Sequence, residues 1–234
     1  MLNTIKLFCI PFSGGNAYSY SEFKKYLSGN IKLINLELPG RGKRINEPLL
    51  TNIDLMTEDL FCQIKNEVSG RYAIFGHSLG ALLAFTLCKY ITIKGANPPL
   101  ILFLSGQTAA SLIEADDRSC LPDDEFINML KEMKGTPEEL LEDNSFIKFF
   151  LPIIRADFQS IATYRYTPVN LPLTVPITVL LGSEEEVNNE DAARWQQETD
   201  RTISIHRFKG AHFFIFNQTE EICRLISEKV NQFI

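Results

Sequence analysis

The sequence contains few cysteines and no paired cysteine motif. Its five cysteines are odd in number, scattered, and never spaced as C-x-x-C; they are Cys9, Cys62, Cys88, Cys120 and Cys223. This pattern excludes a disulfide framework and indicates no zinc site, because both need cysteines in pairs or clusters. We therefore expect the cysteines to be small apolar side chains with free thiols. Free thiols are typical of a reducing compartment, so we expect the protein to be cytoplasmic.

Basic charge and long apolar runs are also scarce. Lys and Arg total 23 against 29 Asp and Glu, which gives a net charge of −6. An acidic chain without a basic run is a poor binder of nucleic acids and anionic membranes. The longest uncharged stretch, Ala96–Ile113, includes Pro98-Pro99, whereas a membrane-spanning helix needs about 20 mostly apolar residues. The N-terminus lacks the apolar core and cleavage site of a secretory signal. We expect no nucleic-acid partner and no membrane association.

Short apolar runs alternate with helical patterns along most of the chain. The 234 residues suit a single α/β domain, 1–234. The runs that predict strands are Ile5–Ile10, Ile31–Leu36, Tyr72–Phe75, Leu100–Leu104, Val175–Leu181 and Ile203–Phe208. Helical patterns occupy about 20–27, 55–68, 81–93, 192–198 and 219–233. This order is typical of a mostly parallel sheet with helices on both faces.

The interval between Gly106 and Val175 breaks the alternation. Its apolar residues have helical spacing, as in Phe126, Met129, Leu130 and Met133. A structureless loop of this length is improbable in a compact domain. We interpret the interval as a small helical cap over the end of the sheet, with a set of ordinary packing helices as the alternative. Its phenylalanines could line an acyl-sized cavity or simply fill a core.

The strongest motif is Gly76-His77-Ser78-Leu79-Gly80, between a predicted strand and a predicted helix. A G-x-S-x-G in this position indicates a nucleophile elbow, in which the serine lies on a sharp, strained turn. The flanking glycines allow the neighbouring backbone to approach closely. The N–H of Leu79 and the start of the helix can stabilise an oxyanion. We predict Ser78 as the nucleophile.

A serine nucleophile needs a base, and the chain has only three histidines. His77 adjoins the nucleophile, where its side chain should point away from the reacting face. His206 lies inside a strand pattern and is expected to be a half-exposed strand residue. His212 follows that strand, and ligand sites of open α/β sheets lie beyond the carboxyl ends of strands. We predict His212 as the base.

The acid that orients His212 should follow a strand between Ser78 and His212. The predicted strand 175–181 is followed by Gly182-Ser183-Glu184-Glu185-Glu186. Glu185 is the first candidate, Glu184 the second and Asp191 the third; the alternative is a solvated acidic turn. Glu is one methylene longer than Asp, which the chemistry tolerates because the acid orients the histidine and does not take its proton.

The second oxyanion donor should come from a loop early in the fold. Pro11-Phe12-Ser13-Gly14-Gly15 follows the first predicted strand. We predict the N–H of Phe12 or of Ser13 as this donor, with a plain tight turn as the alternative. The chain offers no cluster of metal ligands, and we expect no metal and no cofactor.

The sequence resembles the stand-alone type II thioesterases that accompany non-ribosomal peptide and polyketide synthases. The motifs that carry the resemblance run in order along almost the whole chain: Pro11-Phe12-Ser13-Gly14-Gly15, Leu38-Pro39-Gly40-Arg41-Gly42, Gly76-His77-Ser78-Leu79-Gly80, Leu121-Pro122-Asp123, Leu151-Pro152-Ile153-Ile154-Arg155-Ala156-Asp157 and Gly210-Ala211-His212. The elbow alone fits any α/β-hydrolase, whereas the other motifs are more specific. One departure is Glu185, because the family usually has Asp there.

The resemblance implies an α/β-hydrolase fold with a helical lid at roughly 108–166. It implies hydrolysis of acyl thioesters on the phosphopantetheine arm of carrier proteins, with Ser78, His212 and the N–H groups of Leu79 and Phe12 or Ser13 as the machinery. The partners would be carrier domains of a synthase, and the protein would be a monomer. Phosphopantetheine would belong to the partner.

Two other functions use the same residues. A general carboxylesterase or lipase would act on small oxygen esters without a protein partner, and a non-catalytic binding protein would use the pocket as a receptor. For carrier docking, the compact basic group Arg41, Lys43 and Arg44 is the candidate surface. The alternative is that this group is an ordinary solvated loop.

Overall fold

The computed structural model describes residues 4–114, 118–133, 142–168 and 172–234. Its centre is a six-stranded sheet in the order β2-β1-β3-β4-β5-β6, in which every neighbouring pair is parallel. The strands are β1 (Ile5–Ile10), β2 (Ile31–Asn35), β3 (Tyr72–His77), β4 (Leu102–Ser105), β5 (Ile177–Gly182) and β6 (Ser204–Phe208). Each predicted strand is present, and its ends lie at most two residues from the prediction. The predicted α/β class is confirmed.

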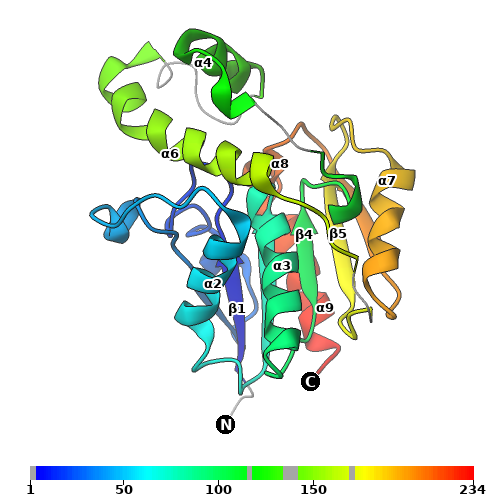
Figure 1. Cartoon of the computed structure of the whole chain (residues 1–234). Coiled ribbons are helices and arrows are strands. Elements are labelled where there is room, and N and C mark those ends of the chain that lie inside the picture. Colours follow the sequence, from blue (N-terminus) through cyan, green and yellow to red (C-terminus); the bar gives the residue numbers. More distant parts are fainter. Residues whose placement is uncertain (1–3, 115–117, 134–141, 169–171) are drawn as a thin grey trace.

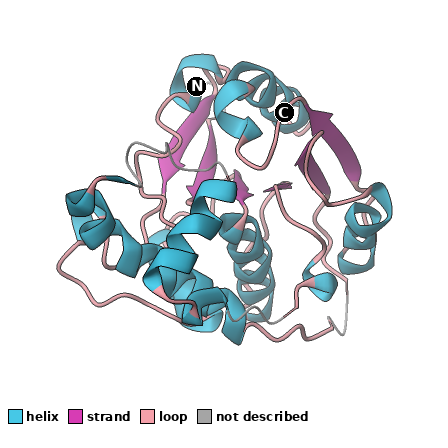
Figure 2. Cartoon of the chain, turned by 90° about the horizontal axis from the view of Figure 1, so that it is seen from above, coloured by secondary structure: helices cyan, strands magenta, loops and turns pink. Residues whose placement is uncertain are grey.

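Helices cover both faces of the sheet (Figures 1 and 2). One core contains side chains of α2 (Ile53–Ile64), α3 (Leu79–Ile93), α7 (Asn189–Ala193) and the 3₁₀ helix η4 (Arg194–Glu198). The other core contains side chains of α1 (Phe23–Tyr26), α8 (Phe214–Asn217) and α9 (Thr219–Asn231). Neighbouring strand residues alternate between them, as Phe8 and Cys9 do. Every residue of β3, β4 and β5 is buried, which explains why these central strands are mostly apolar.

Two predicted helices are shorter or less regular than their patterns indicate. The pattern at 20–27 forms only α1, since turns precede it and the hydroxyl of Ser21 donates to the carbonyl of Tyr18. Such local side-chain bonds compete with helix formation. The pattern at 192–198 divides between α7 and η4, where Trp195 is fully buried against Phe85.

The interval after β4 forms η2 (Ala110–Leu112), η3 (Arg118–Cys120), α4 (Asp123–Glu132) and α6 (Asn144–Thr163). Figure 1 shows α4 and α6 above the carboxyl ends of the strands. Their buried residues form a third cluster, apart from the two main cores: Phe126, Leu130, Leu151, Ile154 and Phe158. Residues 115–117 and 134–141 of the predicted lid lie outside the described residues. The division into one domain with a lid insertion stays a prediction.

All five cysteines are free thiols. In the described ranges, no helix is both long enough and apolar enough to cross a bilayer.

Candidate active site

Ser78 lies at the turn between β3 and α3 and has a φ of 56° and a ψ of −121°. It is the one non-glycine residue with positive φ in the described part of the chain. Strain of this kind persists where the surroundings impose it, and it concentrates at functional sites. A Cβ at Gly76 would lie 1.9 Å from the carbonyl oxygen of Gly80, and one at Gly80 would lie 2.3 Å from that of Ile10. The tight elbow therefore requires both glycines.

His212 lies in the loop between β6 and α8, and its ring is bonded to Glu185. Nδ1 of His212 lies 2.6 Å from Oε1 of Glu185. Oε2 of Glu185 accepts a 2.5 Å hydrogen bond from the N–H of Gly182, so both carboxylate oxygens are fixed. The Glu185 side chain is only 6% exposed. A carboxylate beside Nδ1 holds the proton there and leaves Nε2 as the basic atom.

Nε2 of His212 is buried and has no hydrogen-bond partner in the described part of the chain. Ser78 and His212 line the same cavity, together with Ser13. In unliganded sites, bonds between nucleophile and base are often long and tighten only with substrate. The free Nε2 is therefore suited to receive the proton of a nucleophile in this cavity.

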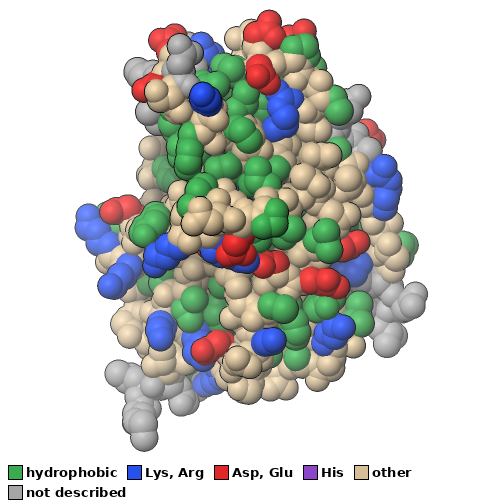
Figure 3. Space-filling model, turned by 60° about the vertical axis from the view of Figure 1, so that its left-hand side comes forward, with side chains coloured by type: hydrophobic (Ala, Val, Ile, Leu, Met, Phe, Trp, Pro, Cys, Tyr) green, Lys and Arg blue, Asp and Glu red, His purple; other side chains and the backbone are tan. Residues whose placement is uncertain are grey.

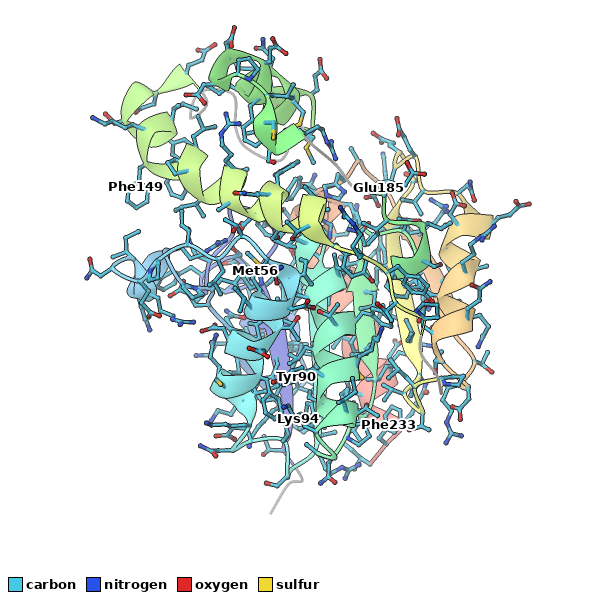
Figure 4. The ribbon with its side chains drawn as sticks, viewed as in Figure 1. Met56, Tyr90, Lys94, Phe149, Glu185 and Phe233 are labelled. Atoms are coloured by element: carbon cyan, nitrogen blue, oxygen red, sulfur yellow. The ribbon has the colours of Figure 1, made fainter. Side chains whose placement is uncertain are left out.

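The other two candidate acids lie elsewhere. Glu184 is exposed at the cavity wall. Asp191 belongs to α7, where its Oδ2 accepts from the side-chain amide of Asn188. Of the three candidates, the structure brings Glu185 to His212. Figure 4 shows Glu185 just beyond the upper end of β5, at the end of the sheet that α6 covers.

The remaining histidines do not line the cavity. His77 is fully buried, and its Nδ1 lies 2.9 Å from Oγ of Ser105. Its ring centroid lies 4.8 Å from that of His212, so the His77 ring packs beside the ring of the predicted base. Burial, and secondly His212, hold the pKa of His77 well below its usual value. His206 is half-buried on β6, and burial lowers its pKa as well.

The cavity has a volume of about 550 Å³. Residues of α4 and α6 line one wall, which is mostly apolar apart from Glu132: Leu130, Ile154, Phe158 and Ile161. The opposite side carries the elbow, His212 and the three glutamates Glu184, Glu185 and Glu186. Such a shape can hold an apolar acyl group against the helices with its carbonyl at Ser78. Nowhere in the described ranges do three or more His, Cys, Asp or Glu side chains form a group that could hold a metal ion.

A family model for the thioesterase domain matches residues 5–230. The chain belongs to the thioesterase family. The gramicidin S biosynthesis protein GrsT of Aneurinibacillus migulanus is 33% identical over 228 residues, which cover 97% of this chain and 89% of GrsT. This confirms the resemblance inferred from the motifs.

Solved structures show that this thioesterase has the α/β-hydrolase fold. ClbQ, from the colibactin NRPS/PKS pathway, is 33% identical, with a TM-score of 0.92 over 98% of both chains. BorB, a type II thioesterase from the borrelidin biosynthetic cluster, is 30% identical, with a TM-score of 0.89 over 98% of this chain and 94% of BorB.

The thioesterase has two backbone segments that fit the predicted oxyanion hole. Leu79 begins α3, and first-turn N–H groups have no partner within a helix. On the opposite side is the loop after β1, where the N–H of Gly15 donates to the carbonyl of Phe12 at 2.8 Å. Ser13 lines the cavity, while the ring of Phe12 packs between Phe213 and His77. Phe12 and Ser13 both stay predictions for the donor.

Of the predicted docking group Arg41, Lys43 and Arg44, Lys43 is exposed, but the two arginines are not free cations at the surface. Arg41 is buried and bonded to Asp157, while Arg44 is paired with Glu47 and Asp59. Figure 3 shows one face of the molecule, on which basic and acidic side chains lie beside one another. The prediction was wrong because neither arginine is a free cation. Arg41 and Asp157 belong to two of the family motifs, but nothing in the sequence indicates that they are partners.

Proposed function

We propose that this thioesterase is a serine hydrolase that cleaves acyl thioesters from the phosphopantetheine arm of carrier proteins. Its role would be editing, in which stalled or mis-primed chains are cleared from a non-ribosomal peptide or polyketide synthase. The names of GrsT, ClbQ and BorB connect those proteins with gramicidin S, colibactin and borrelidin biosynthesis, and they support this role for a chain that matches them over nearly its full length.

In the proposed first step, Ser78 Oγ attacks the thioester carbonyl carbon while Nε2 of His212 takes the hydroxyl proton. The C=O electron pair moves onto oxygen, and the N–H of Leu79 and that of Phe12 or Ser13 stabilise the resulting oxyanion. When the carbonyl re-forms, the C–S bond breaks and the thiolate receives the proton from His212. Glu185 keeps the imidazole oriented and stabilises its charged form. The products are an acyl ester of Ser78 and a free pantetheine thiol.

In the second step, His212 removes a proton from water, whose oxygen attacks the ester carbonyl through the same oxyanion hole. Collapse of this intermediate breaks the bond to Ser78 Oγ, which recovers the proton from His212. The carboxylic acid leaves and the enzyme is restored. Both steps use the same side chains and backbone groups of this chain, and the second also consumes one water molecule.

The observation that carries the proposal is the 2.6 Å contact of His212 with a buried Glu185 in a cavity that Ser78 also lines. A carboxylate used in this way commits one ring nitrogen and leaves the other for proton transfer. The apolar wall of α6 supports an acyl substrate.

The test compares specificity constants for one short acyl group on a loaded carrier protein and on a simple oxygen ester. We expect a preference for the carrier of at least about 100-fold, and loss of both activities in Ser78→Ala. A comparable rate on the oxygen ester would identify a general esterase. Failure of a fluorophosphonate to label Ser78 would instead favour a binding protein.

A further inference from the structure

A buried ion pair joins the loop after β2 to α6. Arg41 Nη1 and Nη2 donate to Oδ2 and Oδ1 of Asp157, both at 2.7 Å. The side chains are 3% and 0% exposed. Two charges in this position have lost their hydration, and a pair of apolar residues of similar volume is often at least as stabilising. Stability alone therefore does not explain the pair.

Asp157 makes a third bond, to the loop that carries the predicted oxyanion donor. Its Oδ2 accepts from the N–H of Gly14 at 2.7 Å, and Arg41 Nη1 also reaches the carbonyl of Gly15 at 3.4 Å. The Gly14 nitrogen belongs to the peptide group that follows Ser13. Because a peptide group is planar, a bond to this N–H fixes the orientation of the whole Ser13–Gly14 unit.

α6 also packs closely against Gly14. Its φ is 76°, and a Cβ there would lie 2.7 Å from Cγ1 of Ile154. Ile154 precedes Asp157 by three positions, so both lie on one face of α6. The same helix supplies Ile154, Phe158 and Ile161 to the cavity wall. One rigid element thus bounds the cavity and holds the loop.

We propose that Asp157, paired with Arg41, is a positioning residue for thioester hydrolysis. Its carboxylate holds the Gly14 peptide, and thereby the Phe12–Ser13 backbone, where an N–H can bind the oxyanion. The two bonds from Arg41 hold the Asp157 side chain in place, aimed at Gly14. The inference rests on the proposed function, and it assigns one task to three family motifs that are distant in sequence.

The main test is the double variant Arg41→Met/Asp157→Leu, which removes the acceptor for Gly14 without leaving a buried charge unpaired. The substrate is a small acyl thioester, so that carrier recognition plays no part. We expect kcat to fall about 100-fold, because misplacing a group by about 1 Å costs this much, while KM changes less than about twofold. The inhibition constant of a trifluoromethyl ketone, whose adduct at Ser78 is an oxyanion, should rise in parallel.

Two further variants separate positioning from stability. Arg41→Lys keeps the acceptor for Gly14 but loses the two-point bond that aims it, so kcat should fall by less than in the double variant even though the melting temperature falls. Asp59→Asn is the matched control, because it removes the carboxylate of an arginine pair that does not contact the loop. It should change neither kcat nor inhibitor affinity.

A folded double variant with wild-type kcat and wild-type inhibitor affinity would overturn the inference. If the double variant does not fold, the smaller pair Arg41→Leu/Asp157→Ala, which also removes the acceptor for Gly14 and leaves no buried charge unpaired, provides the same readout, and an unchanged kcat there would overturn the inference equally. Wild-type protein that is inactive on every thioester would instead refute the proposed function, so the two failures can be distinguished.

Discussion

The two sides of the cavity are built differently. On the sheet side, Ser78, Glu185 and His212 lie on turns that follow β3, β5 and β6, and glycines and backbone hydrogen bonds determine their positions. The helical side depends on a small cluster of its own, separate from the two main cores, with Asp157 as its buried polar anchor. On the proposed function, the turns at the sheet edge would carry the chemistry, whereas the helical side would bound the space for the acyl group.

The largest effect is expected at the sheet edge itself. Ser78→Ala removes the nucleophile and should lower kcat at least about 10⁴-fold, with the fold intact, because only the binding and oxyanion contributions remain. Single-turnover hydrolysis of a small thioester measures this loss. A residual rate near that of wild type would show that the chemistry does not pass through Ser78.

The second prediction concerns the acid. Glu185→Gln keeps the size of the side chain but removes the charge that holds the Nδ1 proton, so kcat should fall about 10³- to 10⁴-fold. Glu185→Asp is one methylene shorter and should lose less. Glu190→Gln, on the exposed start of α7, is the control and should keep wild-type kcat. Wild-type activity in the Glu185→Gln variant would mean that another carboxylate orients His212.

The third prediction separates the two sides by stability. Phe158 is buried in the helical cluster, and truncation of such a residue costs about 3–5 kcal/mol. In Phe158→Ala we expect amide exchange in α6 to accelerate about 100-fold or more, with β3 and β4 still protected. Phe85→Ala, in the main core, should instead lower protection throughout. Equal loss everywhere in Phe158→Ala would mean that the helices are not a separate unit.

The smallest effect is a pH dependence of the sheet edge. Burial lowers the pKa of His77 below 6.5, its value in an unfolded chain. Above pH 6.5 His77 is neutral in both the folded and the unfolded chain, so the free energy of unfolding is not reduced. Below it, only the unfolded chain takes up the proton, so the free energy of unfolding falls by up to about 1.4 kcal/mol per pH unit.

Denaturant titrations of wild type and His77→Gln between pH 7.5 and 5.5 test this expectation, and the variant should show the shallower slope. His206, whose pKa burial also lowers, contributes equally to both proteins and cancels in the comparison. Parallel slopes would mean that His77 is protonated in the folded state.

The sequence predicted the sheet edge well because its signals are local. A Cβ at Gly76 or Gly80 would clash with the backbone, so the two glycines indicate the tight elbow. The apolar runs indicate strands that are buried on both faces. The contact between the rings of His77 and His212 and the Arg41–Asp157 pair were not predicted. Both depend on side chains that meet only after folding, and an arginine in a loop is interpreted as solvated unless its partner, 116 positions away, is known.

The strand order has a consequence for how the protein gains its activity during folding. The first four strands, with Ser78 and the loop after β1, are complete by Ser105, but Glu185 and His212 arrive only with β5 and β6. Pairing of β5 with β4 closes a loop of about 70 residues, and non-local closure of this kind is slow. On the proposed mechanism, a chain emerging from the ribosome would therefore carry an inert serine until the last two strands join the sheet. The appearance of activity would then mark completion of the sheet.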